Sequence, residues 1–183
     1  IWFATYFGVT SEGFRMLSEE EMDQSLLAAA GRAVAWIFIP LGWGNWQAAV
    51  ASITGLVAKE NIVGTMGILY PGGWSEIGAN FTQAAGYSFL VFNLLCAPCF
   101  AAIGAIRREM NSAKWTWFAI GYQCGLAYAA ALMIYQIGSA FAGNVNVIGL
   151  LAAIVILGGM VYMLFRPYRE TAKLTARVKM ADL

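Results

Sequence analysis

The chain has 183 residues, of which 60% are hydrophobic and 11% are charged, and its mean hydropathy is +0.65. This composition leaves too little polar surface to enclose the apolar side chains in water. It argues against a water-soluble globular domain and predicts an all-α, polytopic helical bundle in a membrane. The net charge of +1 argues against nucleic-acid recognition, so we expect the lipid bilayer, and no nucleic acid, as a partner.

The sequence contains no histidine, which is the commonest side-chain ligand of transition metals. An iron site with two histidines and one carboxylate is therefore excluded, and so is serine–histidine hydrolysis. Any metal site has to use thiolate, thioether, carboxylate, amide or carbonyl groups. No GxxxxGK[ST] phosphate loop is present, and we expect no enzymatic activity. Because the chain opens Ile-Trp-Phe without an initiator methionine, we interpret it as a piece of a longer protein.

The first residues, 1–25, precede the apolar part of the chain and are assigned to an extramembrane or interfacial segment. Residues 26–165 are expected to form the membrane region. Its first apolar stretch, 26–39, is only about 14 residues long, carries Arg32 and runs into Pro40. This pattern predicts a short, re-entrant or broken helix, and whether it crosses the membrane stays open.

Four further stretches are long enough to cross a bilayer, which takes about 20 mostly apolar residues. We predict four full spans, at 46–70, 81–106, 115–137 and 145–165. Aromatic side chains near the span ends, Trp43 and Trp46 among them, are expected to be interfacial anchors.

The basic residues predict the orientation, because lysine and arginine in short loops favour the cytoplasmic side. Arg107, Arg108 and Lys114 lie between the second and third full spans, and further basic residues fill the tail, 166–183. The loop 138–144 contains neither lysine nor arginine. We therefore expect a multi-pass protein with a basic cytoplasmic tail at 166–183.

The second full span carries the motif Asn93-Leu-Leu-Cys96-Ala-Pro98-Cys99 near its middle. Proline has no backbone N–H and its ring crowds the carbonyl of Leu94, so we expect the helix to kink or open there. A break at membrane depth is tolerated only where protein or water satisfies the freed backbone, which indicates a cavity or pathway. Asn93, Cys96 and Cys99 recur every three residues, which favours one shared face with ligands for a soft or borderline cation.

Other interpretations of the cysteines stay open. Free cysteine is a common small buried hydrophobe, so Cys99 does not require a metal partner. The Cys96-x-x-Cys99 spacing is also found in thiol–disulfide oxidoreductases, although their motif opens a helix after a strand. Cys124 lies in Gly121-Tyr-Gln-Cys-Gly125, where close helix packing is the better explanation.

Lys59 and Glu60 are adjacent charges inside the first full span. A charge at the bilayer centre costs about 2.5 to 3.5 kcal/mol on insertion scales unless it is paired or hydrated. Adjacent helical positions do not face each other, which argues against a mutual salt bridge. We expect Glu60 to face a cavity as a cation ligand or proton carrier, and Lys59 to pair with another acid or to reach the interface. The alternative is a shorter span with both residues at a break, which the nearby glycines favour.

These segments resemble the ferrous iron transport protein B family, from about Gly42 onward. The resemblance is carried by Gly55-Leu-Val-Ala-Lys59-Glu60-Asn-Ile-Val-Gly64-Thr65, by Pro98-Cys99 and the following Ala-Ile-Gly-Ala-Ile-Arg107-Arg108-Glu109, by Trp115-Thr-Trp117 and by 128–136. It implies a cytoplasmic GTP-binding domain followed by a membrane domain with two inverted gate repeats. This chain is then the second gate with the C-terminal spans, and GTP would bind only to the absent N-terminal part.

The resemblance also implies transport of Fe(II) across the bacterial cytoplasmic (inner) membrane. It assigns the family's gate cysteine to Cys99 through the Pro-Cys match, and it includes Glu60 through the Ala-Lys-Glu segment. Cys96 departs from the family pattern, which commonly has an aromatic residue there. The predicted metal-contacting residues are Cys99, Cys96, Glu60 and Asn93. Expected partners are ferrous iron, the bilayer, the rest of the polypeptide and, as a further option, other copies of the chain.

Three alternative functions stay open on the sequence. Similar gate repeats occur in carriers of organic solutes such as nucleosides. A membrane thiol oxidoreductase would use Cys96 and Cys99. A purely structural membrane subunit would need neither Cys99 nor Glu60.

Overall fold

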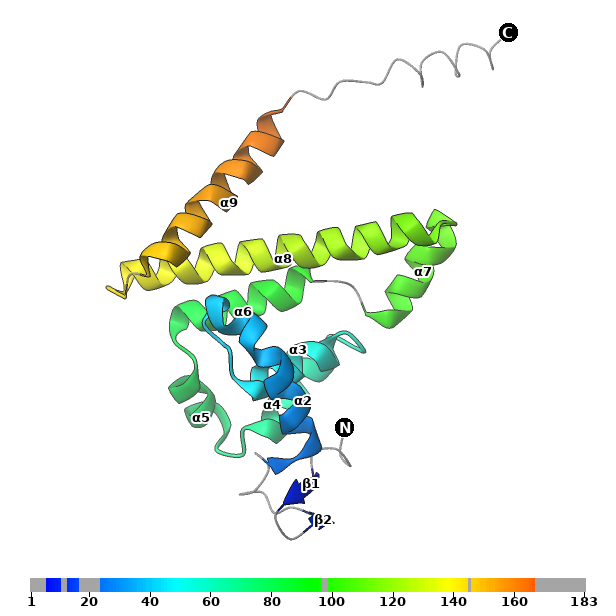
Figure 1. Cartoon of the computed structure of the whole chain (residues 1–183), viewed down its shortest axis with the longest axis vertical. Helices are drawn as coiled ribbons and strands as arrows, with labels where there is room; N and C mark the ends of the chain where they lie inside the picture. The colour runs from blue at the N-terminus through cyan, green and yellow to red at the C-terminus, as the bar shows by residue number, and fades with distance from the viewer. Residues whose placement is uncertain (1–5, 11–12, 17–23, 97–98, 145, 167–183) are drawn as a thin grey trace.

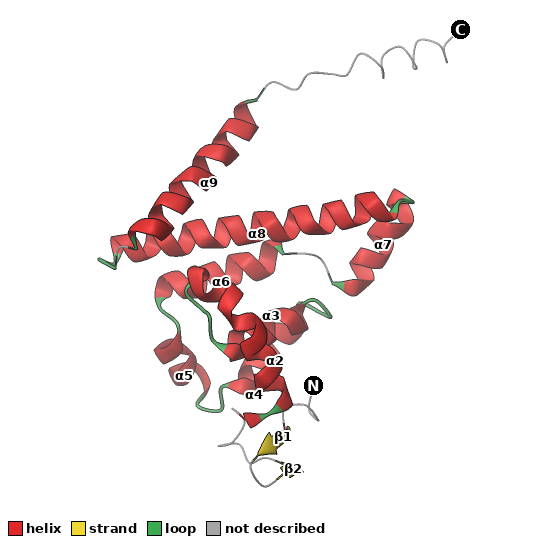
Figure 2. Cartoon of the chain, in the orientation of Figure 1, coloured by secondary structure: helices red, strands yellow, loops and turns green. Residues whose placement is uncertain are grey.

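The computed structural model describes residues 6–10, 13–16, 24–96, 99–144 and 146–166. Helices dominate these residues, which confirms the all-α class (Figure 2). The described residues also contain a β-hairpin, in which β1 (Phe7–Thr10) pairs with the antiparallel strand β2 (Gly13–Met16). The hairpin lies in the segment that the sequence analysis assigned outside the membrane. The predicted basic tail lies outside the described residues beyond Arg166.

The short or broken helix predicted at the start of the membrane region is confirmed. Helix α2 (Leu26–Ala35) continues into the 3₁₀ helix η2 (Trp36–Leu41), and α3 (Trp46–Gly55) follows at an angle of 96°. The turn begins at Gly42, whose φ of 87° lies in the left-handed region that glycine adopts without strain. A bend of this size makes the pair a broken span or a re-entrant loop.

The continuous span predicted over 46–70 is wrong, because the chain breaks at 56–60 between α3 and α4 (Asn61–Leu69). The structure instead agrees with the alternative interpretation, a shorter span with Lys59 and Glu60 both at a break. The two helices stay together through Thr54 and Thr65, whose hydroxyl oxygens are 3.1 Å apart. Helix α5 (Gly73–Asn80) follows as a short surface helix.

The break predicted near Pro98 is confirmed by the helices on either side of it. Helix α6 (Gln83–Leu95) ends at Cys96, and α7 (Phe100–Met110) begins after Cys99, with an angle of 40° between the two axes. Pro98 itself lies outside the described residues.

Helices α8 (Ala113–Phe141) and α9 (Val147–Phe165) are each long and apolar enough to cross a membrane. With the two bent pairs, α2–η2 with α3 and α6 with α7, the described residues contain up to four spans. Helix α8 has 29 residues and is about 44 Å long, and α6 packs along it (Figure 1). Helix α9 starts beside the end of α8 and then extends away from the other helices (Figure 1).

An aromatic cluster fills the core between η2 and α6. The Trp43 ring stacks on Phe38 with centroids 4.3 Å apart and meets the edge of Phe89 at 5.1 Å. Its Nε1 donates a 3.3 Å hydrogen bond to Ser88 Oγ. Trp43 and Trp46 are only 1% and 8% exposed, so their prediction as interfacial anchors is wrong: the 96° bend turns this part of the chain into the core.

Candidate functional site

Two helix breaks meet in a partly exposed region, which we call the break junction. It consists of residues 56–60, between α3 and α4, together with Cys96 and Cys99, which flank the gap between α6 and α7. The backbone N–H of Phe100, at the start of α7, donates a 3.0 Å hydrogen bond to the carbonyl of Leu56. The start of one helix therefore satisfies the backbone of the other break.

Lys59, in the break after α3, makes a second connection, to the end of α6. Its Nζ donates to the carbonyl oxygens of Leu94 at 3.0 Å and Cys96 at 3.4 Å. The last carbonyls of a helix lack partners within the helix and carry its negative dipole end, so an ammonium group is favoured there. Lys59 was expected to pair with another acid or to reach the interface. Its ammonium group instead binds two backbone carbonyls.

Glu60 lies beside Lys59 but has a different environment. It directly precedes α4, is exposed and makes no side-chain capping bond to that helix. The expected cavity around its carboxylate is therefore not formed by the described part of this chain, and a role as ligand stays a prediction.

Asn93 lies in the last turn of α6 and is half-buried. Its Nδ2 donates a 2.8 Å hydrogen bond to the Phe89 carbonyl of the same helix. Its amide oxygen faces Gly55, where an added Cβ would come within 3.8 Å of it. The acceptor end of the amide is therefore turned toward the break after α3.

The three cysteines are free thiols, and each is half-buried. The Sγ atoms of Cys96 and Cys124 are 3.7 Å apart, which joins the end of α6 to the middle of α8. Cys99 caps the start of α7 without using its side chain for a capping bond. Sequence reasoning missed Cys124, because its small-residue spacing was already explained by helix packing. The sequence signal that could have indicated its role is the presence of a cysteine near the middle of the predicted span 115–137.

No group of three or more His, Cys, Asp or Glu side chains gathers in the part of the chain that the structure describes. The predicted metal-contacting residues Cys99, Cys96 and Glu60 therefore do not form one cluster there. They line successive parts of the break junction.

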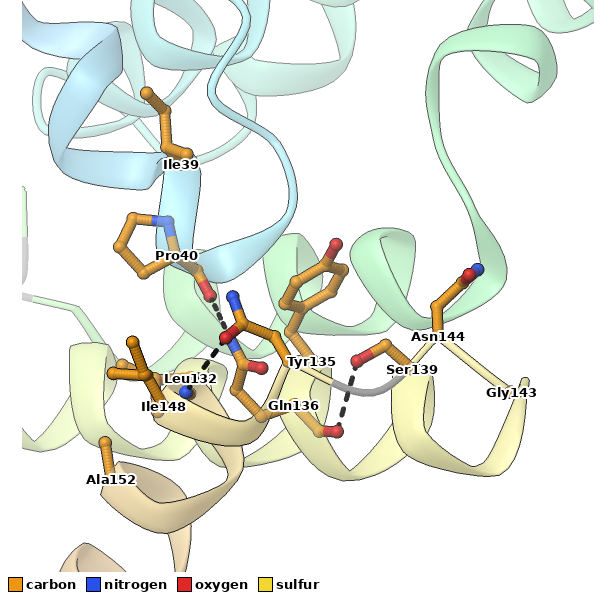
Figure 3. Close-up of a pocket in the computed structure, with 12 residues that line it drawn as sticks. Ile39, Pro40, Leu132, Tyr135, Gln136, Ser139, Gly143, Asn144, Ile148 and Ala152 are labelled. Carbon is orange, nitrogen blue, oxygen red and sulfur yellow. Dashed lines mark hydrogen bonds between the residues drawn. The ribbon is translucent and has the colours of Figure 1, made fainter.

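A separate cavity of about 870 Å³ lies between η2, the second half of α8 and the start of α9 (Figure 3). Two polar side chains of its lining, Gln136 and Ser139, make hydrogen bonds to backbone carbonyls. Gln136 Nε2 donates to the Pro40 carbonyl at 2.9 Å, and Ser139 Oγ donates to the Gln136 carbonyl at 3.1 Å. Nearby, the Tyr128 hydroxyl donates to the Ile37 carbonyl at 2.8 Å. The Gln136 and Tyr128 bonds fix the short helix η2 on α8.

Bent helix pairs that meet beside long apolar helices define a polytopic membrane protein of the broken-helix class, in which irregular backbone lies within the protein. The chain belongs to the Gate family, described as nucleoside recognition, which matches residues 1–113. No solved structure matches the chain.

Known relatives confirm the resemblance to ferrous iron transport protein B. The chain is 36% identical over 145 residues to the Fe(2+) transporter FeoB of Staphylococcus aureus strain COL, covering 77% of this chain and 21% of that protein. It is 34% identical over 149 residues to FeoB of Methanocaldococcus jannaschii, covering 76% and 21%. A fusion of Fe(2+) transport protein A with FeoB from Porphyromonas gingivalis is 31% identical over 141 residues, covering 67% and 17%. The chain thus spans about a fifth of the length of the curated relatives it matches.

Proposed function

We propose that this chain is part of the membrane domain of a ferrous-iron transporter and that Fe(II) passes through the break junction. The similarity to Fe(2+) transporters supports the cargo. The observation that carries the proposal is the meeting of two helix breaks, where Lys59 holds the carbonyls of Leu94 and Cys96 beside a cysteine thiol. Broken helices with exposed carbonyls are where transporters bind cations.

The proposed metal-contacting residues are Cys99, Cys96, Asn93 and Glu60. Their thiolate, amide and carboxylate groups favour a divalent transition metal over sodium or calcium. Transport also requires that an ion can leave each site, so a few ligands along a path suit this function better than a closed cage. An arrangement without a three-residue cluster among the described residues fits that requirement.

Lys59 has a further role in this proposal. Its ammonium group binds the Leu94 and Cys96 carbonyls, which are the groups that a passing cation would use. Like charges repel at short range in a poorly screened site, so the ammonium and Fe(II) cannot share these oxygens. Lys59 therefore moves aside when the ion passes and returns afterwards, which keeps the carbonyls satisfied in both states.

We propose the remaining features from the resemblance. The chain lies in the bacterial cytoplasmic membrane with its C-terminus in the cytoplasm, in agreement with the basic residues near 107–114 and in the tail. The rest of the same polypeptide supplies the first gate and the GTP-binding domain. The exposed apolar surface of α9, in which Ala153 is the one buried residue, fits contact with lipid, with the first gate or with a second copy.

The test is anaerobic uptake of ferrous iron by cells that express the full-length transporter with Cys99→Ser or Glu60→Gln at matched membrane abundance. We expect both variants to lose most of the uptake, because each removes a proposed ligand. Glu109→Gln is the matched control, since Glu109 is an exposed acid near the end of α7, outside the junction. Normal uptake by Cys99→Ser would remove the thiol from the path, and normal uptake by Glu60→Gln would remove the carboxylate.

The same assay separates the alternative functions. Competition by Mn(II), Co(II) or Zn(II), with no effect of added nucleosides, agrees with a metal path. Competition by nucleosides would instead favour the organic-solute carrier. Trapping of a mixed disulfide at Cys96 or Cys99 would favour the thiol oxidoreductase, and full tolerance of alanine at Cys99 and Glu60 would favour a structural subunit.

A further inference from the structure

We propose that Cys96 and Cys124 form a two-thiolate site for a thiophilic divalent cation, between the end of α6 and the middle of α8. The site goes beyond the proposed iron path, which does not include Cys124. Its test measures binding to the purified protein, so it succeeds or fails independently of the uptake result.

The distance between the two sulfur atoms carries the proposal. Thiolates bind a tetrahedral divalent ion at about 2.3 Å, which places two such sulfur atoms roughly 3.8 Å apart at the tetrahedral angle. The Sγ atoms of Cys96 and Cys124 are 3.7 Å apart without any ion between them. A disulfide instead needs a separation of about 2.05 Å, so the two sulfur atoms would have to approach considerably. The observed spacing is that of two thiols in contact, and it is close to the spacing that one tetrahedral ion bound to both sulfur atoms requires.

The backbone around both cysteines is fixed, so the spacing is held by the helix packing. The N–H of Cys96 completes α6 with a 2.8 Å hydrogen bond to the Phe92 carbonyl, and its own carbonyl accepts from Lys59 at 3.4 Å. Cys124 lies within the continuous helix α8, against which α6 packs along its length (Figure 1). A site on packed helices is preorganised, because little conformational entropy is lost when an ion binds.

The charges also fit a divalent ion at this depth. Both thiols are half-buried, and each loses its proton when it binds a metal, so one ion releases two protons. Two thiolates and one divalent cation sum to zero, and no net charge is added inside the membrane region. Sulfur ligands favour Cd(II), Zn(II) and Fe(II) over Ca(II) and Mg(II). Water would fill the remaining coordination positions, which keeps the ion exchangeable.

The experiment is a titration of the full-length transporter with Cd(II), in detergent, after reduction and removal of the reductant under anaerobic conditions. Binding is followed by the ultraviolet charge-transfer band of thiolate–cadmium bonds. We expect Cys96→Ser and Cys124→Ser each to abolish binding at this site, because either variant leaves a single thiolate and no chelate. The double variant should be no weaker than either single variant, because the two thiolates act as one chelate. Glu109→Gln, an exposed position outside both sites, is the control and should keep the band.

A second measurement on the unmodified protein avoids any effect of substitution on folding. Alkylation by iodoacetamide is measured cysteine by cysteine, with and without Cd(II). We expect Cys96 and Cys124 to become protected together at the same Cd(II) concentration. The proposal is overturned if Cys124 is alkylated at the same rate with and without Cd(II), if Cys124→Ser retains the full band, or if the two residues are already linked as a disulfide in protein prepared anaerobically.

Discussion

Lys59 Nζ donates a 3.0 Å hydrogen bond to the carbonyl oxygen of Leu94, which ties the break after α3 to the end of α6. Leu94 precedes Pro98 by four residues, and proline cannot supply the N–H that would satisfy this carbonyl in a helix. The ammonium group provides the missing donor. Lys59 in the first predicted full span and Pro98 in the second therefore belong to one structural arrangement, in which the ammonium group replaces the missing proline N–H.

Lys59→Met removes both hydrogen bonds and leaves the carbonyls of Leu94 and Cys96 without these donors. A hydrogen bond contributes about 0.5–1.5 kcal/mol to stability, so we expect the purified full-length protein to unfold at a lower temperature. Lys59→Arg keeps a cationic donor and should retain most of the stability. Lys114→Met, at the exposed start of α8, is the control for loss of a charge. Equal stability of Lys59→Met and the wild type would show that the bond does not support the fold.

The break near Pro98 could be predicted from the sequence because it depends on local chemistry, whereas the break at 56–60 was only an alternative to a continuous span. Proline lacks a donor wherever it occurs, so the break near Pro98 follows from the residue type alone. The partners of Lys59 could not be predicted in this way. Leu94 and Cys96 lie 35 and 37 residues further along the chain, and only the packing of α6 beside the first break brings them to the ammonium.

The contacts of Cys124 and the burial of Trp43 could not be predicted from the sequence either. The thiol of Cys96 lies 28 residues from that of Cys124 in sequence, and no periodic pattern joins two different helices. A tryptophan beside proline and glycine at the end of an apolar stretch has the pattern of an interfacial anchor. The 96° bend that follows turns Trp43 inward, and a bend angle cannot be predicted from hydropathy.

Thr65→Val tests the link between α3 and α4. Thr54 Oγ1 donates to the Ala51 carbonyl at 2.9 Å, so the hydroxyl of Thr65 has to be the donor in the 3.1 Å contact between the two threonines. Valine keeps the shape and removes that donor, and both side chains are buried, so we expect a loss of about 1 kcal/mol. Thr65→Ser keeps the hydroxyl and serves as the comparison. Thermal unfolding in detergent measures both, and a more stable valine variant would show that this bond does not stabilise the link between α3 and α4.

Gly42→Ala tests the turn between η2 and α3. Gly42 and Gly143 both have a φ of 87°, but a Cβ at Gly42 would overlap the ring of Tyr135, whereas Gly143 has open space around it. Alanine at either position is strained by about 1–2 kcal/mol, and only at Gly42 does the steric overlap add to this cost. We expect Gly42→Ala to lower the amount of folded protein in the membrane well below that of Gly143→Ala. Similar amounts of the two variants would mean that the Tyr135 ring moves aside without cost.

Gln136→Leu tests how η2 is held on α8. Gln136 is 4% exposed, and its Nε2 is 2.9 Å from the Pro40 carbonyl oxygen, which loses this donor when leucine replaces the amide (Figure 3). We expect η2 to open more often, because a partly buried hydrogen bond that contributes about 0.5–1.5 kcal/mol is lost. The N–H of Gly42, bonded to the Ile39 carbonyl at 3.0 Å, reports this opening through faster hydrogen exchange of the η2 segment. Ser139→Ala removes only a local bond on α8 and should leave that exchange unchanged. Unchanged exchange in Gln136→Leu would mean that the aromatic core alone holds η2 in place.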